Sequence, residues 1–456
     1  MSTISDFLTK TARENVQDAL EKARANESFH ALLSLNETRA LERAEAVDKG
    51  EVTGKLAGVP FIAKDNFLTF GGTTTAASKI LENFEAPLQA TAIEKLEAEG
   101  AICIGKANLD AFAHGGSTEN SAYGPTKNAV DDTRVAGGSS GGSAVVVALD
   151  IVPFALGTDT GGSIRQPASF NGVVGVKPTY GTVSRYGVVA MASSTDTIGV
   201  LASSVDDATL VMDIMSGKDN KDMTTLPDFF IPSVLEGKKK IGVIKEAMTE
   251  DVDADVRRVT NGYVEKLKAA GHEVEEVSLS LLKYALAIYY IVVPAEISSN
   301  LGRYDGIRYG RRAEAKTLGE LYGSSRDQGF MTENKRRIMI GSYVLSSGFF
   351  DAYYLQAQKV RTLLINEFNE LFNRYDVLVA PVAPTPAFKL GENTEDPVKM
   401  YLADVMTVPA SLAGLPAISV PAGETSEGLP VGVQLIGKRK DDTLLLALAK
   451  SMEATA

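Results

Sequence analysis

Serines set in glycine-rich turns are the residues of this chain best suited to covalent chemistry. The sequence reads GGSSGGS over Gly137–Ser143 and GGS over Gly161–Ser163, on either side of the apolar run Ala144–Leu156. Glycine lets the backbone come close to a bound group. A serine hydroxyl beside exposed backbone N–H groups is the arrangement that acyl transfer requires. One such turn is usually a tight connection beside a buried helix, but two of them, with the dense string Ser163–Pro167, favour a catalytic site.

A serine nucleophile needs a proton acceptor, and the chain has only three histidines. His114 is the one that lies in a loop, but no G-x-S-x-G turn accompanies it, so a Ser-His-Asp triad has weak support and stays open. Lys64 is the other candidate because it ends the apolar strand Gly58–Ala63, where burial can lower the pKa of an amine. Taken alone, a lysine at a strand end more often reaches solvent.

Taken together, Lys64, Ser139 and Ser163 resemble the catalytic set of the amidase signature family. Three motifs carry this resemblance: GVPFIAKDN ending at Asn66, GGSSGGS ending at Ser143, and TDTGGSIRQP ending at Pro167. The resemblance extends over nearly the whole chain. It implies an α/β fold in which one large domain has a central mixed β-sheet covered by helices on both faces.

The resemblance also implies the role of each residue. Ser163 attacks an amide carbonyl and becomes the acyl ester, while Ser139, preceded by a cis peptide bond, passes the proton to Lys64. Backbone N–H groups of the nucleophile turn form the oxyanion hole; they belong to Thr160, Gly161, Gly162 and Ser163. Asp159 and Arg165 are expected to brace this turn rather than react.

Further segments resemble the glutaminase subunits of tRNA-dependent amidotransferases within this family. They are Ser117–Ser121, Arg185–Gly187, Arg303–Gly310, Lys335–Ile338, Ser346–Tyr354, Ala413–Pro416 and Val433–Gly437. The resemblance implies that the chain hydrolyses glutamine and sends ammonia to a B subunit, which uses ATP and Mg to activate a misacylated tRNA, while a small C subunit clasps the pair. This chain itself would bind no cofactor. A free-standing amidase acting on another small amide, and an idle scaffold protein of the complex, are the alternatives.

Glutamine carries an α-carboxylate and an α-ammonium, so its pocket should offer one charge of each sign. The resemblance assigns these roles to Arg337 and Asp404. A guanidinium can grip a carboxylate through two parallel hydrogen bonds. From spacing alone, two ordinary surface charges on helices are about as probable.

Composition and residue spacing exclude several classes of protein and of binding site. The net charge of -12 argues against direct binding of nucleic acid by this chain. The single cysteine, Cys103, excludes an internal disulfide and fits a reducing compartment. The N-terminus lacks a signal sequence, and no apolar run reaches the ~18 residues of a spanning helix, so we expect a cytoplasmic protein without membrane contact. No residue spacing indicates a metal site or a phosphate-binding loop.

The elements that must position these residues alternate between strands and helices, which predicts an α/β sheet. Residues 1–456 are expected to form one domain: N-terminal helices (1–50, two helices joined near Asn26–Ser28), a signature core (56–200) and the remainder (201–456). Helices are expected over 90–100, 143–149, 205–215, 254–271, 279–300, 350–375 and 444–452. Strands are expected over 56–63, 101–105, 173–176, 188–191, 238–245, 272–277, 376–381, 417–421 and 432–437.

Overall fold

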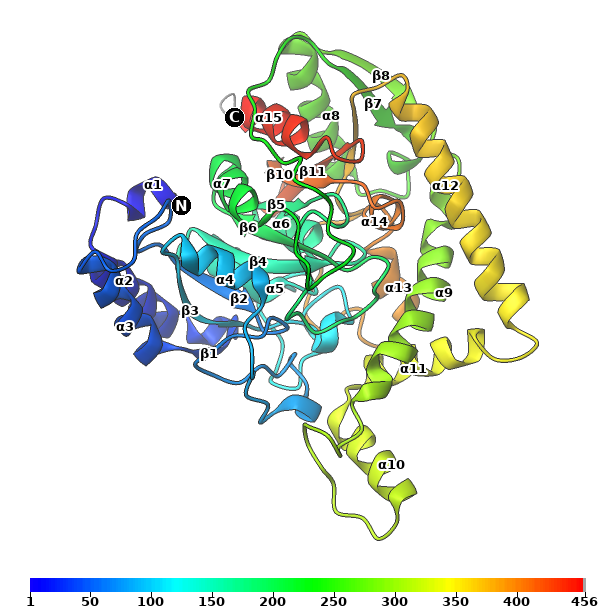
Figure 1. Ribbon diagram of the computed structural model, residues 1–456. Coiled ribbons are helices and arrows are strands. Elements are labelled where there is room, and N and C mark those ends of the chain that lie inside the picture. The colour runs from blue at the N-terminus through cyan, green and yellow to red at the C-terminus, as the bar shows by residue number, and fades with distance from the viewer. Residues whose placement is uncertain (454–456) are drawn as a thin grey trace.

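A mixed β-sheet forms the centre of the molecule in the computed structural model, which describes residues 1–453. Within these residues eleven strands join in the order β1-β3-β2-β4-β6-β5-β10-β11-β9-β7-β8, and helices cover both faces (Figure 1). The strands are β1 (Leu32–Leu35), β2 (Pro60–Lys64), β3 (Ile102–Ala107), β4 (Phe154–Asp159), β5 (Val174–Lys177), β6 (Thr197–Ala202), β7 (Lys240–Ile244), β8 (Glu273–Val277), β9 (Val377–Pro381), β10 (Ala417–Glu424) and β11 (Pro430–Gly437). The expected fold class is confirmed.

Helices of very different length surround the sheet. They are α1 (Ile4–Phe7), α2 (Ala12–Ala25), α3 (Glu37–Asp48), α4 (Thr91–Ala98), α5 (Gly141–Ala148), α6 (Arg165–Asn171), α7 (Val205–Met215), α8 (Ala254–Ala269), α9 (Leu282–Asn300), α10 (Leu318–Gly329), α11 (Thr332–Val344), α12 (Gln356–Phe372), α13 (Pro397–Leu402), α14 (Val408–Leu412) and α15 (Asp442–Glu453). A π-helical turn, Phe350–Leu355, precedes α12. Helix α10 projects from the body as an arm (Figure 1).

The core follows the alternation of side chains along each strand. Phe61 and Ala63 of β2 join one hydrophobic cluster, which includes residues of α4, α7 and α15, while Ile62 joins another with α2, α3 and α5. Successive side chains of a strand point to opposite faces, so β2, β3 and β4 each contribute to both clusters. This two-sided burial explains why these strands are continuous apolar runs.

Several sequence expectations need correction. Val188–Met191 is not a strand, since only Val188 forms an isolated antiparallel bridge, with Phe67. The N-terminal region holds the two expected longer helices but also β1, which pairs antiparallel with β3 at the sheet edge. Strands β4 and β6 and helices α1, α6, α10, α11, α13 and α14 are not among the elements expected from the sequence. Of these, β4, α6, α11 and α13 carry residues of the site described below.

Helix α9 organises the side of the molecule that bears α11. By length and mean hydropathy (1.2) the segment Leu282–Arg303 could cross a membrane, which departs from the sequence expectation, but half of it is buried inside the protein. It packs against α11 so closely that a Cβ on Gly341 would lie 1.9 Å from the carbonyl oxygen of Pro294. Glycine at this position therefore lets α11 approach α9, which sets the position of the residues on α11.

Candidate active site

Lys64 ends β2 inside a ring of hydroxyl groups. Its side chain is fully buried, and Nζ lies 2.8 Å from Ser139 Oγ, 2.8 Å from Ser140 Oγ and 3.0 Å from Thr158 Oγ1. Burial lowers the pKa of Lys64 to about 7, against the opposing effect of nearby carboxylates. Near neutral pH a large share of the amine is thus unprotonated, and its lone pair can accept a proton from a hydroxyl.

Parallel strands bring these groups together. Strand β2 pairs with β4, so Lys64 and Thr158 lie near the same ends of two neighbouring strands. The Ser139 loop is held to the next motif, because Ser140 N–H donates to Ser163 O (3.1 Å) and Gly138 N–H donates to Gln166 Oε1 (2.8 Å). The peptide bond between Gly138 and Ser139 is cis.

Ser163 lies just before α6, in the turn between β4 and that helix. Ser163 is buried, with 7% of its surface accessible to solvent. Within residues 1–453 its hydroxyl makes no hydrogen bond, so the structure places Ser163 beside the Ser139 loop without linking the two hydroxyl groups directly. Lys64 contacts both Ser139 and Ser140 at the same distance, and the choice of Ser139 as the relay rests on the sequence motif.

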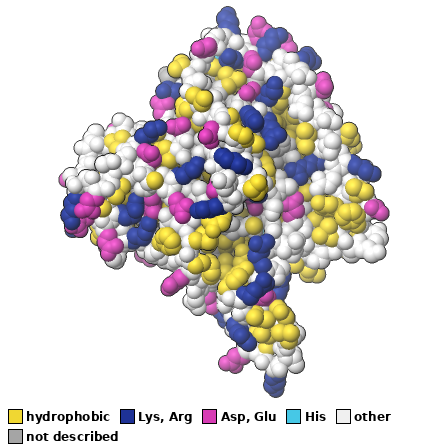
Figure 2. Space-filling view, in the orientation of Figure 1, with side chains coloured by type: hydrophobic (Ala, Val, Ile, Leu, Met, Phe, Trp, Pro, Cys, Tyr) yellow, Lys and Arg dark blue, Asp and Glu magenta, His cyan; other side chains and the backbone are white. Residues whose placement is uncertain are grey.

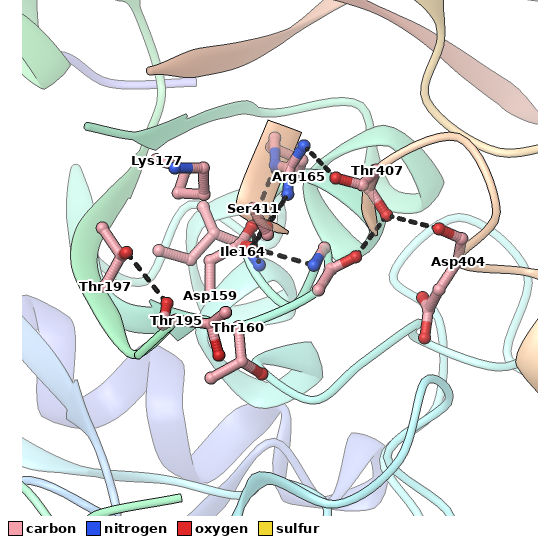
Figure 3. A network of polar contacts seen from close by, with 12 residues as sticks. Asp159, Thr160, Ile164, Arg165, Lys177, Thr195, Thr197, Asp404, Thr407 and Ser411 are labelled. Atoms are coloured by element: carbon pink, nitrogen blue, oxygen red, sulfur yellow. Dashed lines mark hydrogen bonds and ion pairs between the residues drawn. The ribbon is translucent and has the colours of Figure 1, made fainter. Parts of the chain in front are cut away.

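A buried ion pair fixes this turn (Figure 3). Asp159 and Arg165 are both fully buried; Arg165 Nη2 and Nε donate to the two oxygens of Asp159 at 2.9 and 3.0 Å. The same carboxylate accepts the N–H groups of Gly162 (2.9 Å) and Ile164 (3.2 Å). The pair therefore braces the turn, as the sequence predicts.

The expected oxyanion donors differ in their availability. Gly162 N–H is already bound to Asp159, while no hydrogen bond from Thr160, Gly161 or Ser163 N–H to another group occurs in the described part of the chain. A Cβ on Gly161 would lie 2.8 Å from Tyr289 OH, and one on Gly162 would lie 2.2 Å from Thr407 Oγ1. Glycine is needed here because two neighbouring elements pack directly onto the turn.

Arg337 and Asp404 line one cavity of about 190 Å³. Arg337 is 3% exposed, and its Nε donates to Glu333 Oε1 at 2.8 Å. The Asp404 carboxylate accepts no hydrogen bond from any described residue, and no ion pair within 4.0 Å joins it to Arg337. Burial raises the pKa of Asp404 to about 8, with Arg337 opposing the shift. Two scattered surface charges, the alternative that spacing leaves open, do not describe this geometry.

The Asp404 turn is connected to the Ser163 turn. Thr407 Oγ1 donates to Gly161 O at 2.5 Å, and Arg165 Nη1 donates to Thr407 O at 2.9 Å. Figure 3 shows Asp404 and Thr407 on one side of the Asp159–Arg165 network and Thr195 and Thr197 on the other. Thr407 and Arg165 therefore link the segment that carries Asp404 to the turn that carries Ser163, the expected nucleophile.

Three residues of the site are not identified by the sequence analysis. Asp110, fully buried, lines the cavity, and its carboxylate accepts the N–H groups of Thr118 and Asn120. Glu333 and Tyr401 line the same cavity and are hydrogen-bonded to each other. The sequence holds a signal for Asp110, since it follows a buried strand as Lys64 ends one; Glu333 and Tyr401 become neighbours only through the fold.

His114 does not take the place of a catalytic base. It is fully buried, and its Nδ1 lies 2.8 Å from Asn334 Nδ2. Burial and the Arg337 charge hold its pKa well below the ordinary value. No serine hydroxyl among the described residues is hydrogen-bonded to its ring, so the geometry does not support a Ser-His-Asp triad based on His114.

Substitution of Arg165 tests how far the Ser163 turn depends on the ion pair between Asp159 and Arg165. Arg165→Met should lower the free energy of unfolding by about 3–5 kcal/mol, because it leaves the Asp159 carboxylate buried without a counter-charge. Urea unfolding followed by circular dichroism measures this, since the chain has no tryptophan. Lys268→Met, which opens an exposed ion pair with Glu265, is the control and should change stability by less than about 1 kcal/mol. Equal effects of the two variants would contradict the bracing role.

Comparison with known proteins places the chain in a family. The Amidase family model matches residues 14–446. The A subunit of the glutamyl-tRNA(Gln) amidotransferase of Koribacter versatilis is 51% identical, covering 93% of this chain and 91% of its own, and that of Cyanothece sp. is 51% identical, covering 97% and 94%. The crystal structure of the corresponding Thermotoga maritima protein is 41% identical with a TM-score of 0.84, covering 100% of this chain and 95% of its own. This chain is a member of the amidase signature family.

Proposed function

We propose that this chain is the glutaminase subunit of a cytoplasmic glutamyl-tRNA(Gln) amidotransferase. The observation that carries the proposal is the cavity in which the Arg337 guanidinium and the Asp404 carboxyl group lie without pairing to each other. The pKa of Asp404 is raised to about 8, and an ammonium bound beside this carboxyl group would favour its ionised form. Free glutamine carries the complementary charges at its α-carbon. The near-full-length similarity to proteins named as the A subunit of this enzyme supports the same conclusion.

In the proposed reaction Ser163 Oγ attacks the side-chain amide carbon of glutamine. Its proton passes to Ser139, whose proton passes to the unprotonated amine of Lys64. The C–N bond then breaks, and the relay returns the proton to the leaving nitrogen, which departs as ammonia. Water, activated by the same relay, cleaves the glutamyl ester of Ser163 to release glutamate and restore the serine.

Negative charge on the reacting oxygen would be stabilised by backbone N–H groups of the nucleophile turn. Because Asp159 already holds the N–H of Gly162, we assign this role first to Thr160, Gly161 and Ser163. The rigid Asp159–Arg165 pair would keep these donors oriented before the charge develops.

Further steps of the proposal belong to partner subunits. A B subunit would use ATP and Mg to activate Glu-tRNA(Gln), with Asp-tRNA(Asn) as a second substrate of the same kind, and a small C subunit would clasp the pair. Acidic and basic side chains are interspersed over the face in Figure 2, which provides no uniformly basic surface for RNA. Exposed apolar residues on and after α11, among them Met339 (72% exposed) and Tyr343 (50%), are available to a partner.

Ser163→Ala should abolish glutamine-dependent amidation of tRNA by the complex while sparing amidation with added ammonia, since only the acyl step uses this hydroxyl. Ser143→Ala is a matched control, because that hydroxyl lies in the other serine motif and donates to Leu156 O; it should retain activity within about threefold. A glutamyl ester still detected by mass spectrometry in Ser163→Ala would show that the nucleophile is another residue.

The pH dependence of turnover should report Lys64. Because burial lowers the pKa of this lysine to about 7, it carries a proton below that pH and cannot accept another, so kcat should fall about tenfold per pH unit on the acid side. At higher pH the amine is neutral and kcat should level off. Steady-state glutaminase assays from about pH 5.5 to about pH 9 measure this; a flat profile between about pH 5.5 and 7 would exclude Lys64 as the titrating base.

Arg337→Ala and Asp404→Asn should each raise the KM for glutamine more than a hundredfold. Each removes one partner of a pair that is buried once substrate binds, a loss of about 3–5 kcal/mol. Ammonia-dependent amidation should remain intact, because it bypasses this cavity. Steady-state kinetics decide the point: a change in KM below about threefold in both variants, or about 0.65 kcal/mol, would rule out these residues as the glutamine-binding pair.

A further inference from the structure

Glu333 connects the residues that surround the charged cavity. It lies one turn before Arg337 on α11, and its side chain is 13% exposed. Its Oε1 accepts hydrogen bonds from Arg337 Nε (2.8 Å) and from the hydroxyl of Tyr401 (2.9 Å), while Oε2 contacts Arg336 Nη1. Burial alone would raise the pKa of Glu333, but the Arg337 charge and these hydrogen bonds hold it below the ordinary value, so the residue is ionised at neutral pH.

The contact with Glu333 determines which edge of the Arg337 guanidinium is free. A guanidinium has five N–H groups in a planar fork. Glu333 occupies Nε, and within residues 1–453 neither terminal nitrogen of Arg337 donates a hydrogen bond. The two terminal nitrogens form the edge that can meet a carboxylate through parallel hydrogen bonds.

The rings of Tyr290 and Tyr401 also pack against the Arg337 guanidinium. Its central carbon lies 5.2 Å from the ring centroid of Tyr290 and 5.7 Å from that of Tyr401. The two rings are stacked, with centroids 3.8 Å apart. Since Tyr401 also donates to Glu333, one carboxylate sets both the guanidinium and one of the rings beside it.

Charge balance around Arg337 depends on the same residue. Arg336 and Arg337 bring two positive charges, and Glu333 brings one negative charge, so the three leave one net positive charge for a single carboxylate. On the other side, Asp404 follows Tyr401 by one turn, with Asp404 N–H donating to Tyr401 O at 3.1 Å. This backbone hydrogen bond holds Asp404 without involving the Glu333 side chain.

We propose that Glu333 is a positioning residue for the α-carboxylate of the substrate: it orients the free edge of Arg337. This inference rests on the proposed glutaminase function and deepens it. Glu333 acts through Arg337 and does not touch the reacting amide. Its loss should therefore weaken binding of substrates that carry an α-carboxylate and spare those that lack one.

The test compares two amides in the full-length protein. L-Glutamine has the α-carboxylate, and 4-aminobutanamide has the same chain and amine without it. The variants are Glu333→Ala, which removes the acceptor, and Glu333→Gln, which keeps an oxygen that can accept from Arg337 Nε and from the Tyr401 hydroxyl. Lys335→Ala is the control on the same helix, where Lys335 forms an exposed ion pair with Asp327.

Glu333→Ala should raise the KM for glutamine about tenfold or more with kcat within about threefold, and leave kcat/KM for 4-aminobutanamide within about twofold. Glu333→Gln should stay within about threefold of the wild type for both amides, and Lys335→Ala should match the wild type. Equal losses for the two amides in Glu333→Ala would indicate a merely structural role and overturn the inference, as would an unchanged preference for glutamine. A wild-type protein without preference for glutamine would instead overturn the proposed glutamine site itself, and the role of Glu333 with it.

Discussion

The pairing of Asp159 with Arg165 is the constraint on which the site depends. Two charges without solvent contact are tolerated only when hydrogen bonds satisfy their remaining donors and acceptors. Here that requirement draws in groups from distant parts of the chain: Arg165 Nη1 donates to Thr407 O and Gln434 Oε1, and Nη2 donates to Ser411 Oγ. The ion pair thus joins β4 and α6 to α14 and β11, and in doing so fixes the turn that holds Ser163.

The cost of burying a charge also explains the chemistry of Lys64, which, unlike Arg165, has no carboxylate of the described residues in contact with it. The Asp159 carboxylate lies against the Arg165 guanidinium, which stays charged in any protein environment, whereas the immediate partners of Lys64 are neutral oxygens of Ser139, Ser140 and Thr158. Burial without an adjacent counter-charge favours the unprotonated amine. Arg165 therefore has a structural role, whereas Lys64 acts as a base in the proposed mechanism.

The sequence predicts the sheet and the turns better than it predicts the pocket. Helix α7 and strands such as β9 lie where patterning places them, since strong apolar periodicity survives folding. Strand β4 is not predicted, although Asp150 and Pro153 interrupt the apolar run between α5 and β4, because a short buried strand and a buried helix segment have the same apolar composition. The short apolar segment Val188–Met191 has the composition of a strand, but in the described part of the chain it forms only one isolated bridge, between Val188 and Phe67. The contact between Glu333 and Tyr401 spans 68 residues, and no local pattern encodes it.

The separation of Arg337 from Asp404 explains how the cavity could select a zwitterion. Had the two residues paired, each would satisfy the other and a substrate would have to break that bond. Instead Glu333 and the tyrosine rings support the arginine, while burial, Asp159 and Asp110 all raise the pKa of Asp404. An ammonium placed beside Asp404 would favour its ionised form and thereby recover part of the cost of burying it. In the proposed mechanism binding is therefore strongest for a ligand that brings both charges at the spacing of an amino acid, which an uncharged amide does not.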